Sequence, residues 1–157
     1  MYKKILVPLD GSELAECAMN QVKKLFQDDH VGEVVLLNAV VTEIPWRELG
    51  AGEEGHAIRF DYNAFKKAII DKSREYLSRV KSRLSSEGIK VKTETIESNE
   101  PSQTISDYAQ KNGVDLIVIA THGYTGMKKM MLGSIALKVL HESNVPVLLV
   151  RPEACRV

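Results

Sequence analysis

The sequence is poor in cysteine, has no long apolar run and carries no excess charge of either sign. Its only cysteines are Cys17 and Cys155, and no CxxC pair occurs, so no disulfide framework is indicated and we expect two reduced thiols. No apolar run approaches the roughly 20 residues that cross a membrane. Lys and Arg together number 21, as do Asp and Glu. This balance argues against a nucleic-acid binder and against a polybasic membrane anchor.

Length and composition are those of one globular domain, which we expect to span residues 1–157. A chain of 157 residues can bury about 70% of the surface of its unfolded form, which is enough for a core that needs no disulfide or metal for stability. The hydrophobic fraction of 44% and zero net charge exclude a disordered chain. The first apolar stretch ends at Pro8 and Asp10, too early for the roughly 7–15 apolar residues of a signal peptide. We therefore expect a cytoplasmic protein.

Apolar runs and helical periodicities alternate along the chain. Continuous apolar runs predict buried strands, and apolar residues three or four apart predict amphipathic helices. Ser12 is a predicted N-cap, while Gly88 and Gly113 are predicted helix ends. The predicted strands cover residues 4–9, 34–41, 89–97, 116–120 and 147–150. The predicted helices cover residues 13–27, 61–87, 101–112 and 134–143.

This alternation predicts an α/β fold with a five-stranded parallel sheet and helices on both faces. The usual strand order for such a chain is 3-2-1-4-5, in which the first and fourth strands are neighbours. The chain leaves these two strands in opposite directions, and ligands bind beyond the carboxyl ends of strands at such a switch point. Here those ends carry Asp10-Gly11-Ser12 and Ala120-Thr121-His122-Gly123.

The segment from Ala120 to Ser134 follows a predicted strand and precedes a predicted helix. Its glycines let backbone N–H groups approach a ligand, and Gly133-Ser134 stands where the positive end of the helix dipole favours an anion. The segment predicts a phosphate-binding loop, although a glycine-rich connection without a ligand fits the glycines equally well. It is neither a Walker loop nor a G-x-G-x-x-G dinucleotide loop.

Position by position, this segment resembles the nucleotide-binding motif G-x2-G-x9-G-[ST] of the universal stress protein family. Gly123, the nine residues after it and Gly133-Ser134 match the motif, while Ala120 replaces its first glycine. The resemblance extends over the whole chain, through the opening Ile5–Ser12 and the ending Asn144–Val150. It implies a Rossmann-like fold of the adenine nucleotide alpha hydrolase-like (HUP) class.

The resemblance also implies a role for each matching residue, with ATP as the ligand, held with or without Mg²⁺. Asp10 would contact the ribose, with a purely structural turn aspartate as the alternative. The backbone of Ala39 would bind the adenine edge, in a slot lined by Pro8 and Ile119. The residues that would hold the phosphates are Gly123, Gly133, Ser134, Ile135 and Ala136. We expect the methyl group of Ala120 to be tolerated if the backbone there is extended.

Other candidate residues carry weaker signals. Lys128 and Lys129 could reach phosphates, but a solvated basic tip is the more ordinary interpretation. His122 has no acid, base or nucleophile partner at a recognisable spacing, and the four histidines show no metal-binding spacing. Trp46 lies in the predicted loop over residues 42–59, where it is either a lid over the ligand or a packed anchor.

The sequence thus predicts an ATP-binding regulatory protein of the stress response that is not primarily an enzyme. A ligand-free dimeric interaction protein and a weak adenine-nucleotide hydrolase are the alternatives, although no catalytic constellation is found. The final predicted strand, Val147–Val150, is an apolar edge without charge that invites pairing with another chain. The resemblance implies homodimers formed through this strand. We therefore expect a homodimer with adenine nucleotide as its ligand and with neither nucleic acid nor membrane as a partner.

Overall fold

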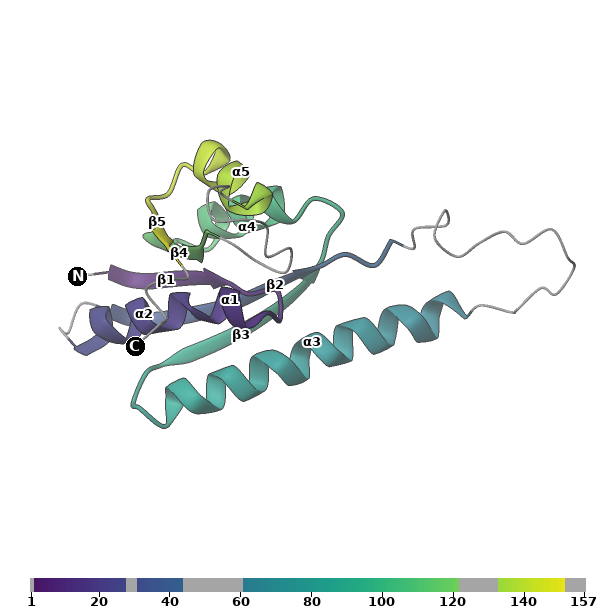
Figure 1. The fold of residues 1–157 in the computed structure, drawn as a ribbon, viewed down its shortest axis with the longest axis horizontal. Coiled ribbons are helices and arrows are strands. Elements are labelled where there is room, and N and C mark those ends of the chain that lie inside the picture. The colour runs from purple at the N-terminus through teal and green to yellow at the C-terminus, as the bar shows by residue number, and fades with distance from the viewer. Residues whose placement is uncertain (1, 28–30, 44–60, 122–132, 152–157) are drawn as a thin grey trace, which may run out of the picture.

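The structure is a computed structural model that describes residues 2–27, 31–43, 61–121 and 133–151. Five parallel strands form one sheet in the order β3-β2-β1-β4-β5 (Figure 1). The strands are β1 (Tyr2–Pro8), β2 (Val31–Val40), β3 (Val91–Glu97), β4 (Leu116–Ala120) and β5 (Val147–Val150). The helices are α1 (Glu13–Glu16), α2 (Ala18–Gln27), α3 (Tyr62–Ser85), α4 (Pro101–Lys111) and α5 (Ser134–Glu142). The predicted α/β architecture and strand order are confirmed.

Two apolar clusters place the core on the two faces of the sheet. On one face, alternate strand residues such as Ile5, Val7 and Leu36 pack with Val22 of α2 and Leu77 of α3. On the other face, the intervening residues pack with α4 and α5, as the second cluster of Leu6, Val35, Leu37, Ile105 and Val139 shows. Figure 1 shows the same layers, with α1, α2 and α3 on one side and α4 and α5 on the other. The central strands are apolar in succession because both faces are covered.

The helix predicted over residues 13–27 is divided into α1 and α2 at Cys17. Ser12 caps α1 as expected, because its side chain accepts a hydrogen bond from the Ala15 N–H. The Cys17 N–H then donates to the Leu14 carbonyl, a tightened turn that separates the two helices. Periodicity alone did not indicate this break, since Leu14, Ala18 and Val22 keep helical spacing across it.

The expectation of two reduced thiols is wrong. Cys17 is disulfide-bonded in the structure, and the described part of the chain contains no free cysteine. The chain's other cysteine, Cys155, lies outside the described residues. The sequence did not indicate the bond because two cysteines 138 positions apart form no recognisable framework.

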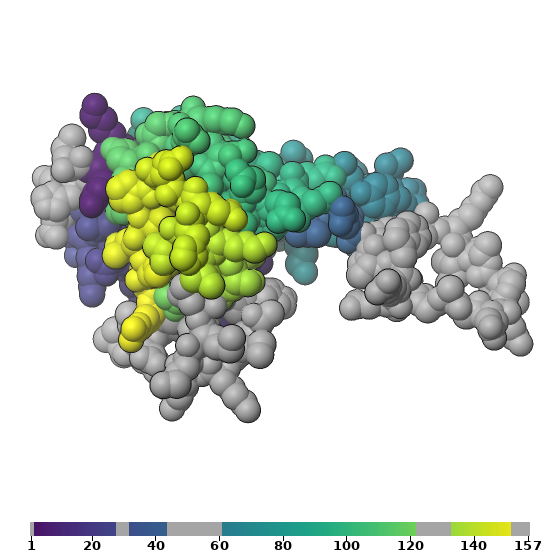
Figure 2. All heavy atoms as spheres, turned by 90° about the horizontal axis from the view of Figure 1, so that it is seen from above, coloured from purple at the N-terminus to yellow at the C-terminus, as the bar shows by residue number. Residues whose placement is uncertain are grey.

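The remaining boundaries follow the predictions within a few residues. The second strand begins at Val31 instead of residue 34, and the third begins at Val91 instead of residue 89. The longest helix, α3, runs along β3 and extends past the end of the sheet (Figure 1). Seen from above, α5 and β5 form one continuous surface beside α4 (Figure 2). In the described ranges, no helix combines the length and the hydropathy that a membrane crossing requires.

Candidate functional site

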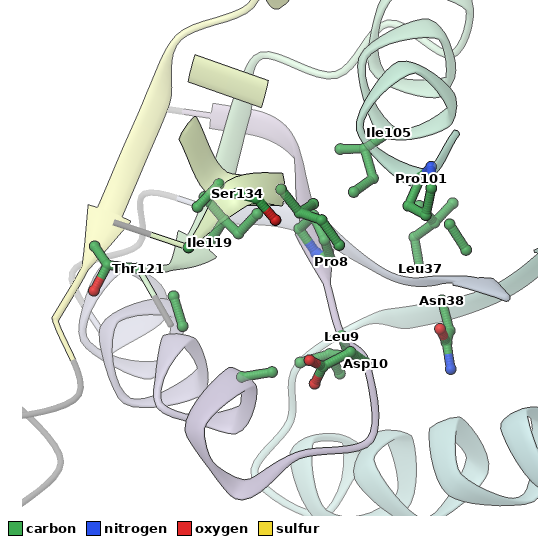
Figure 3. A pocket seen from close by; sticks show the side chains of 16 residues that line it. Pro8, Leu9, Asp10, Leu37, Asn38, Pro101, Ile105, Ile119, Thr121 and Ser134 are labelled. Carbon is green, nitrogen blue, oxygen red and sulfur yellow. The ribbon is translucent and has the colours of Figure 1, made fainter. Parts of the chain in front are cut away.

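A cavity of about 190 Å³ opens at the carboxyl ends of β1, β2 and β4. Figure 3 shows its lining, which is apolar on one side and carries polar side chains at its rim. The cavity lies at the switch point of the sheet, where the sequence places it. Its described lining residues are Pro8, Leu9, Asp10, Ala15, Leu37, Asn38, Ala39, Pro101, Ile105, Ile119, Ala120, Thr121, Gly133, Ser134, Ile135 and Ala136.

The cavity exists because β1 and β4 are paired over a short distance only. Their register consists of Ile5 with Leu116 and Leu6 with Ile117. Beyond these pairs β1 stays with β2 as far as Pro8, while β4 stays with β5 as far as Ala120. The space between the two diverging strands is therefore left for a ligand.

Apolar side chains form a slot in the part of the cavity that faces α4. Pro8 ends β1, Leu37 comes from β2 and Ile119 from β4, while Pro101 and Ile105 come from the first turns of α4. Leu37 and Ile119 are nearly fully buried. A flat apolar ring, such as a purine, is the kind of group that such a slot binds. Pro8 and Ile119, for which the resemblance implies an adenine slot, both line this cavity.

The peptide groups of Ala39 face the cavity, as the hydrogen-bonding pattern of β2 requires. The Leu37 carbonyl accepts from the Leu9 N–H at 2.8 Å, so the backbone N–H and C=O groups of Leu37 point toward β1. The Val40 carbonyl accepts from the Ser98 N–H at 2.9 Å, so the backbone groups of even-numbered residues point toward β3. The backbone groups of Ala39 therefore point toward the β1 side of the strand, at a level where β1 has already ended. Its N–H donor and C=O acceptor are placed to bind the edge of a base.

Asp10 lies at the rim of the cavity and also holds the turn that leads into α1. Its Oδ1 accepts from the Ser12 backbone N–H at 2.9 Å and from the Ser12 hydroxyl at 2.6 Å. Gly11 between them has φ +88°, a conformation that side chains disfavour. The structure thus shows the structural role that was the alternative for this aspartate. The same side chain borders the cavity (Figure 3), so the structural role does not remove it from the site.

The first turn of α5 presents backbone N–H groups at the opposite end of the cavity. Gly133 is the N-cap residue and provides no side-chain cap, and the Leu137 N–H makes the first bond of the helix, to the Gly133 carbonyl. Ser134, Ile135 and Ala136 precede that bond, and all three line the cavity. Unpaired N–H groups at the positive end of a helix dipole form an anion-binding site.

Ala120, the departure from the glycine motif, lies in the extended backbone of β4 and pairs with Val150. Its methyl group is buried and borders the cavity. Glycine is needed only where φ is positive or where another backbone approaches closely. The expected condition for tolerating alanine is therefore met.

Several predicted residues lie outside the described residues. Gly123, His122, Lys128, Lys129 and Trp46 are among them, and their predicted roles stay predictions. Conversely, the cavity includes residues that the sequence did not single out. Pro101 and Ile105 lie in the helix predicted over residues 101–112 and were not assigned to a site, because no sequence pattern shows which helix covers the end of β2. Asn38 interrupts an apolar strand, and this polar interruption was the signal that was missed.

Comparison with known proteins gives consistent matches. The model of the universal stress protein family matches residues 1–151. The universal stress protein MJ0577 of Methanocaldococcus jannaschii is 35% identical over 157 residues, covering 96% of each chain. The universal stress protein YxiE of Bacillus subtilis is 34% identical over 160 residues, covering 96% of this chain and all of the relative.

Solved structures agree with the sequence matches. The structure of MJ0577 has a TM-score of 0.75, with 34% identity and 96% coverage of each chain. A universal stress protein solved in complex with cAMP has a TM-score of 0.59 at 20% identity, covering 96% of this chain and 98% of its own. A universal stress protein family protein from Arabidopsis thaliana with AMP bound has a TM-score of 0.64 at 13% identity, covering 95% and 91%. The last two show likeness of fold alone.

Proposed function

Because the chain belongs to the universal stress protein family, we propose that it is a regulatory protein that binds an adenine nucleotide, with ATP as the ligand. The observation that carries the proposal is the order of groups along one cavity. The apolar slot and Ala39 lie at β2, Asp10 at β1, and the N-terminus of α5 beyond β4. This order matches base, sugar and phosphate in a nucleotide. The cAMP and AMP complexes of two structural neighbours are consistent with it.

The direction of the Ala39 peptide supports adenine as the base. A backbone N–H and C=O on one residue match the N1 acceptor and N6 donor of adenine. Guanine presents a donor at N1 and an acceptor at O6, so the same pair of groups is mismatched. Adenine nucleotides should therefore bind more tightly than guanine nucleotides.

A metal ion would come with the phosphates. Among the described residues, no three His, Cys, Asp or Glu side chains converge into a metal-binding group. Mg²⁺ commonly keeps several water ligands and bridges substrate phosphates instead of occupying a cage of side chains. In this proposal Mg²⁺ enters with ATP, and the protein acts in the cytoplasm as a nucleotide-dependent regulator.

The test is calorimetric titration with ATP, AMP, adenosine and GTP, using a matched pair of variants on α5. Ile135 and Leu137 are each 40% exposed, but only Ile135 lines the cavity. Ile135→Glu places a negative charge at the proposed phosphate site and should weaken ATP binding at least tenfold while changing adenosine binding little. Leu137→Glu should leave both affinities unchanged.

Two outcomes would favour the alternatives. If the wild type binds none of the four compounds, the proposal is wrong and a ligand-free interaction protein is favoured. If ATP binds and the steady rate of phosphate release is proportional to protein concentration, the protein is an adenine-nucleotide hydrolase.

A further inference from the structure

Asn38 is a polar residue in a strand segment where every neighbour is apolar. Residues 34–40 read Val-Val-Leu-Leu-Asn-Ala-Val, and the asparagine is only 9% exposed. A buried carboxamide destabilises a fold unless it finds hydrogen-bond partners. Its presence in this strand therefore needs a reason beyond packing.

The free protein does not supply those partners among its described residues. Neither polar atom of the Asn38 carboxamide is hydrogen-bonded to a described residue, and neither is sealed from solvent. Thr95 lies opposite Asn38 in the register of β2 and β3, but its hydroxyl is paired with that of Ser73 at 3.0 Å. Asn38 is thus 9% exposed, and its carboxamide has no hydrogen-bond partner among the described residues.

Asn38 is one of the residues that line the proposed nucleotide cavity. Leu37 packs on the α4 face of β2, so the alternation of the strand places the Asn38 side chain on the opposite face. Figure 3 shows the carboxamide pointing away from Leu37, Pro101 and Ile105. Asp10 also lines this cavity. The cavity therefore has an apolar slot on one side and a polar rim of Asp10 and Asn38 on the other.

A carboxylate such as that of Asp10 satisfies the donors of a vicinal diol but not its acceptors. A carboxylate only accepts hydrogen bonds, and Oδ1 of Asp10 already accepts two from Ser12. A ribose has two hydroxyls, each of which donates and accepts. A carboxamide donates through Nδ2 and accepts through Oδ1, so it complements a hydroxyl that Asp10 leaves incompletely satisfied.

We propose that Asn38 is a specificity-determining residue that hydrogen-bonds a ribose hydroxyl of the bound nucleotide and selects nucleotides with an intact diol. This inference rests on the proposed function, since it assigns the sugar contact within the same site. The unpaired carboxamide destabilises the free protein, and ribose recognition in the bound protein accounts for its presence.

The experiment compares wild type and Asn38→Leu in titrations with ATP, 2′-deoxy-ATP and 3′-deoxy-ATP. Leucine has a similar volume and no polar atom. We expect Asn38→Leu to weaken ATP binding about three- to tenfold, the effect of one neutral hydrogen bond. The deoxy analogue that lacks the contacted hydroxyl should bind equally to both proteins. Asn20→Leu, at an exposed position of α2, is the matched control and should change nothing.

Melting of the ligand-free proteins gives an independent readout. Asn38→Leu should melt at the same temperature as wild type or higher, because an unpaired buried carboxamide has been removed. If the leucine variant folds poorly, Asn38→Ala serves for the same three titrations.

All other outcomes of these titrations overturn the inference. Equal weakening of all three nucleotides by Asn38→Leu would show a general packing effect, and unchanged ATP binding would show no contact. Either result leaves the proposed function standing. If wild type binds no adenine nucleotide, the inference and the proposed function are both wrong.

Discussion

At the scale of single residues, Asp10 combines a structural role with a place in the proposed site. Its bonds to Ser12 hold the turn before α1, and its position at the end of β1 puts the carboxylate at the rim of the cavity. A substitution at this position can therefore affect the fold and the ligand separately. Two variants distinguish these effects.

Asp10→Asn should lower ATP affinity by about 1.5–3 kcal/mol, the range for a hydrogen bond to a charged group. The amide oxygen can still accept from Ser12, so the melting temperature should change little. Asp10→Ala should lose similar affinity and also some thermal stability, because the Ser12 contacts are removed. Titration calorimetry and thermal melts measure both quantities. Equal wild-type affinity for ATP and 2′,3′-dideoxy-ATP would contradict the assignment of Asp10 to the ribose.

At the scale of secondary-structure elements, an ion pair links α3 to β3 near the end of the sheet, supported by a hydrogen bond from Thr42. Lys66 Nζ lies 2.6 Å from a carboxylate oxygen of Glu97, and the Thr42 hydroxyl donates to the other oxygen at 2.6 Å. The hydrogen bond from Lys66, followed by that from Thr42, lowers the pKa of Glu97 below its ordinary value. A lowered pKa means that the native state favours the carboxylate. This contribution to stability is present above the ordinary pKa of glutamate and is lost as the pH falls through the lowered value.

Lys66→Met should therefore raise the pKa of Glu97 toward its ordinary value, and only in part, because Thr42 still donates. An NMR pH titration of the Glu97 side chain measures the change. Lys67→Met is the matched control one residue away. Lys67 is hydrogen-bonded to Asp71 and holds its pKa below the ordinary value, so this variant should raise the pKa of Asp71 and leave Glu97 unchanged. If Lys66→Met leaves the pKa of Glu97 unchanged, the proposed effect of the Lys66–Glu97 ion pair is contradicted.

The end of α3 depends on Gly88. Its φ is +86°, and a Cβ added there would meet no atom within 4 Å. Gly88→Ala should therefore destabilise the fold by backbone strain alone, by about 1 kcal/mol. Gly88→Asn should cost less, because asparagine tolerates the left-handed region better. Urea denaturation measures both, and an alanine variant as stable as wild type would disprove the strain.

The elements themselves were largely predictable from the sequence, and the residues that close the site were not. Buried strands such as Leu116–Ala120 are recognisable as apolar runs between polar turns. Gly88 and Gly113 were predicted as helix ends, and both have the positive φ that favours glycine there. Asp10, Ile119 and Ser134, which the family resemblance singled out, all line one cavity. Pro101 and Ile105 could not be assigned to it, since their contact with the site depends on how α4 packs over β2. The turn at Cys17 was likewise set by local hydrogen bonding and not by periodicity.

At the scale of the whole molecule, the sheet has two edges of different character. The β3 edge carries Lys92, Glu94 and Glu97, and charges discourage pairing with another strand. The β5 edge consists of Val147, Leu148, Leu149 and Val150, of which the first three are half-buried. An uncharged apolar edge favours pairing with a second copy.

We therefore predict a homodimer through β5, of twice the 17.5 kDa chain mass, or about 35 kDa. Light scattering at micromolar concentration measures it. Leu149→Lys should shift the population toward monomer, because an unpaired charge at the interface is strongly unfavourable. Glu94→Lys on the opposite edge should leave the dimer intact. A wild-type mass near 17.5 kDa would refute the prediction.

The short pairing of β1 with β4 has a consequence for cooperativity. β1 is joined to β2 at six register positions but to β4 at only two, Ile5 with Leu116 and Leu6 with Ile117. We therefore predict that the β3-β2-β1 part and the β4-β5 part differ in their free energies of local opening. If the proposed nucleotide spans the crevice, we expect it to contact both parts and to couple their opening. In native-state hydrogen exchange, the amides of β1 and β4 should show different protection in the free protein and equal protection once the nucleotide is bound.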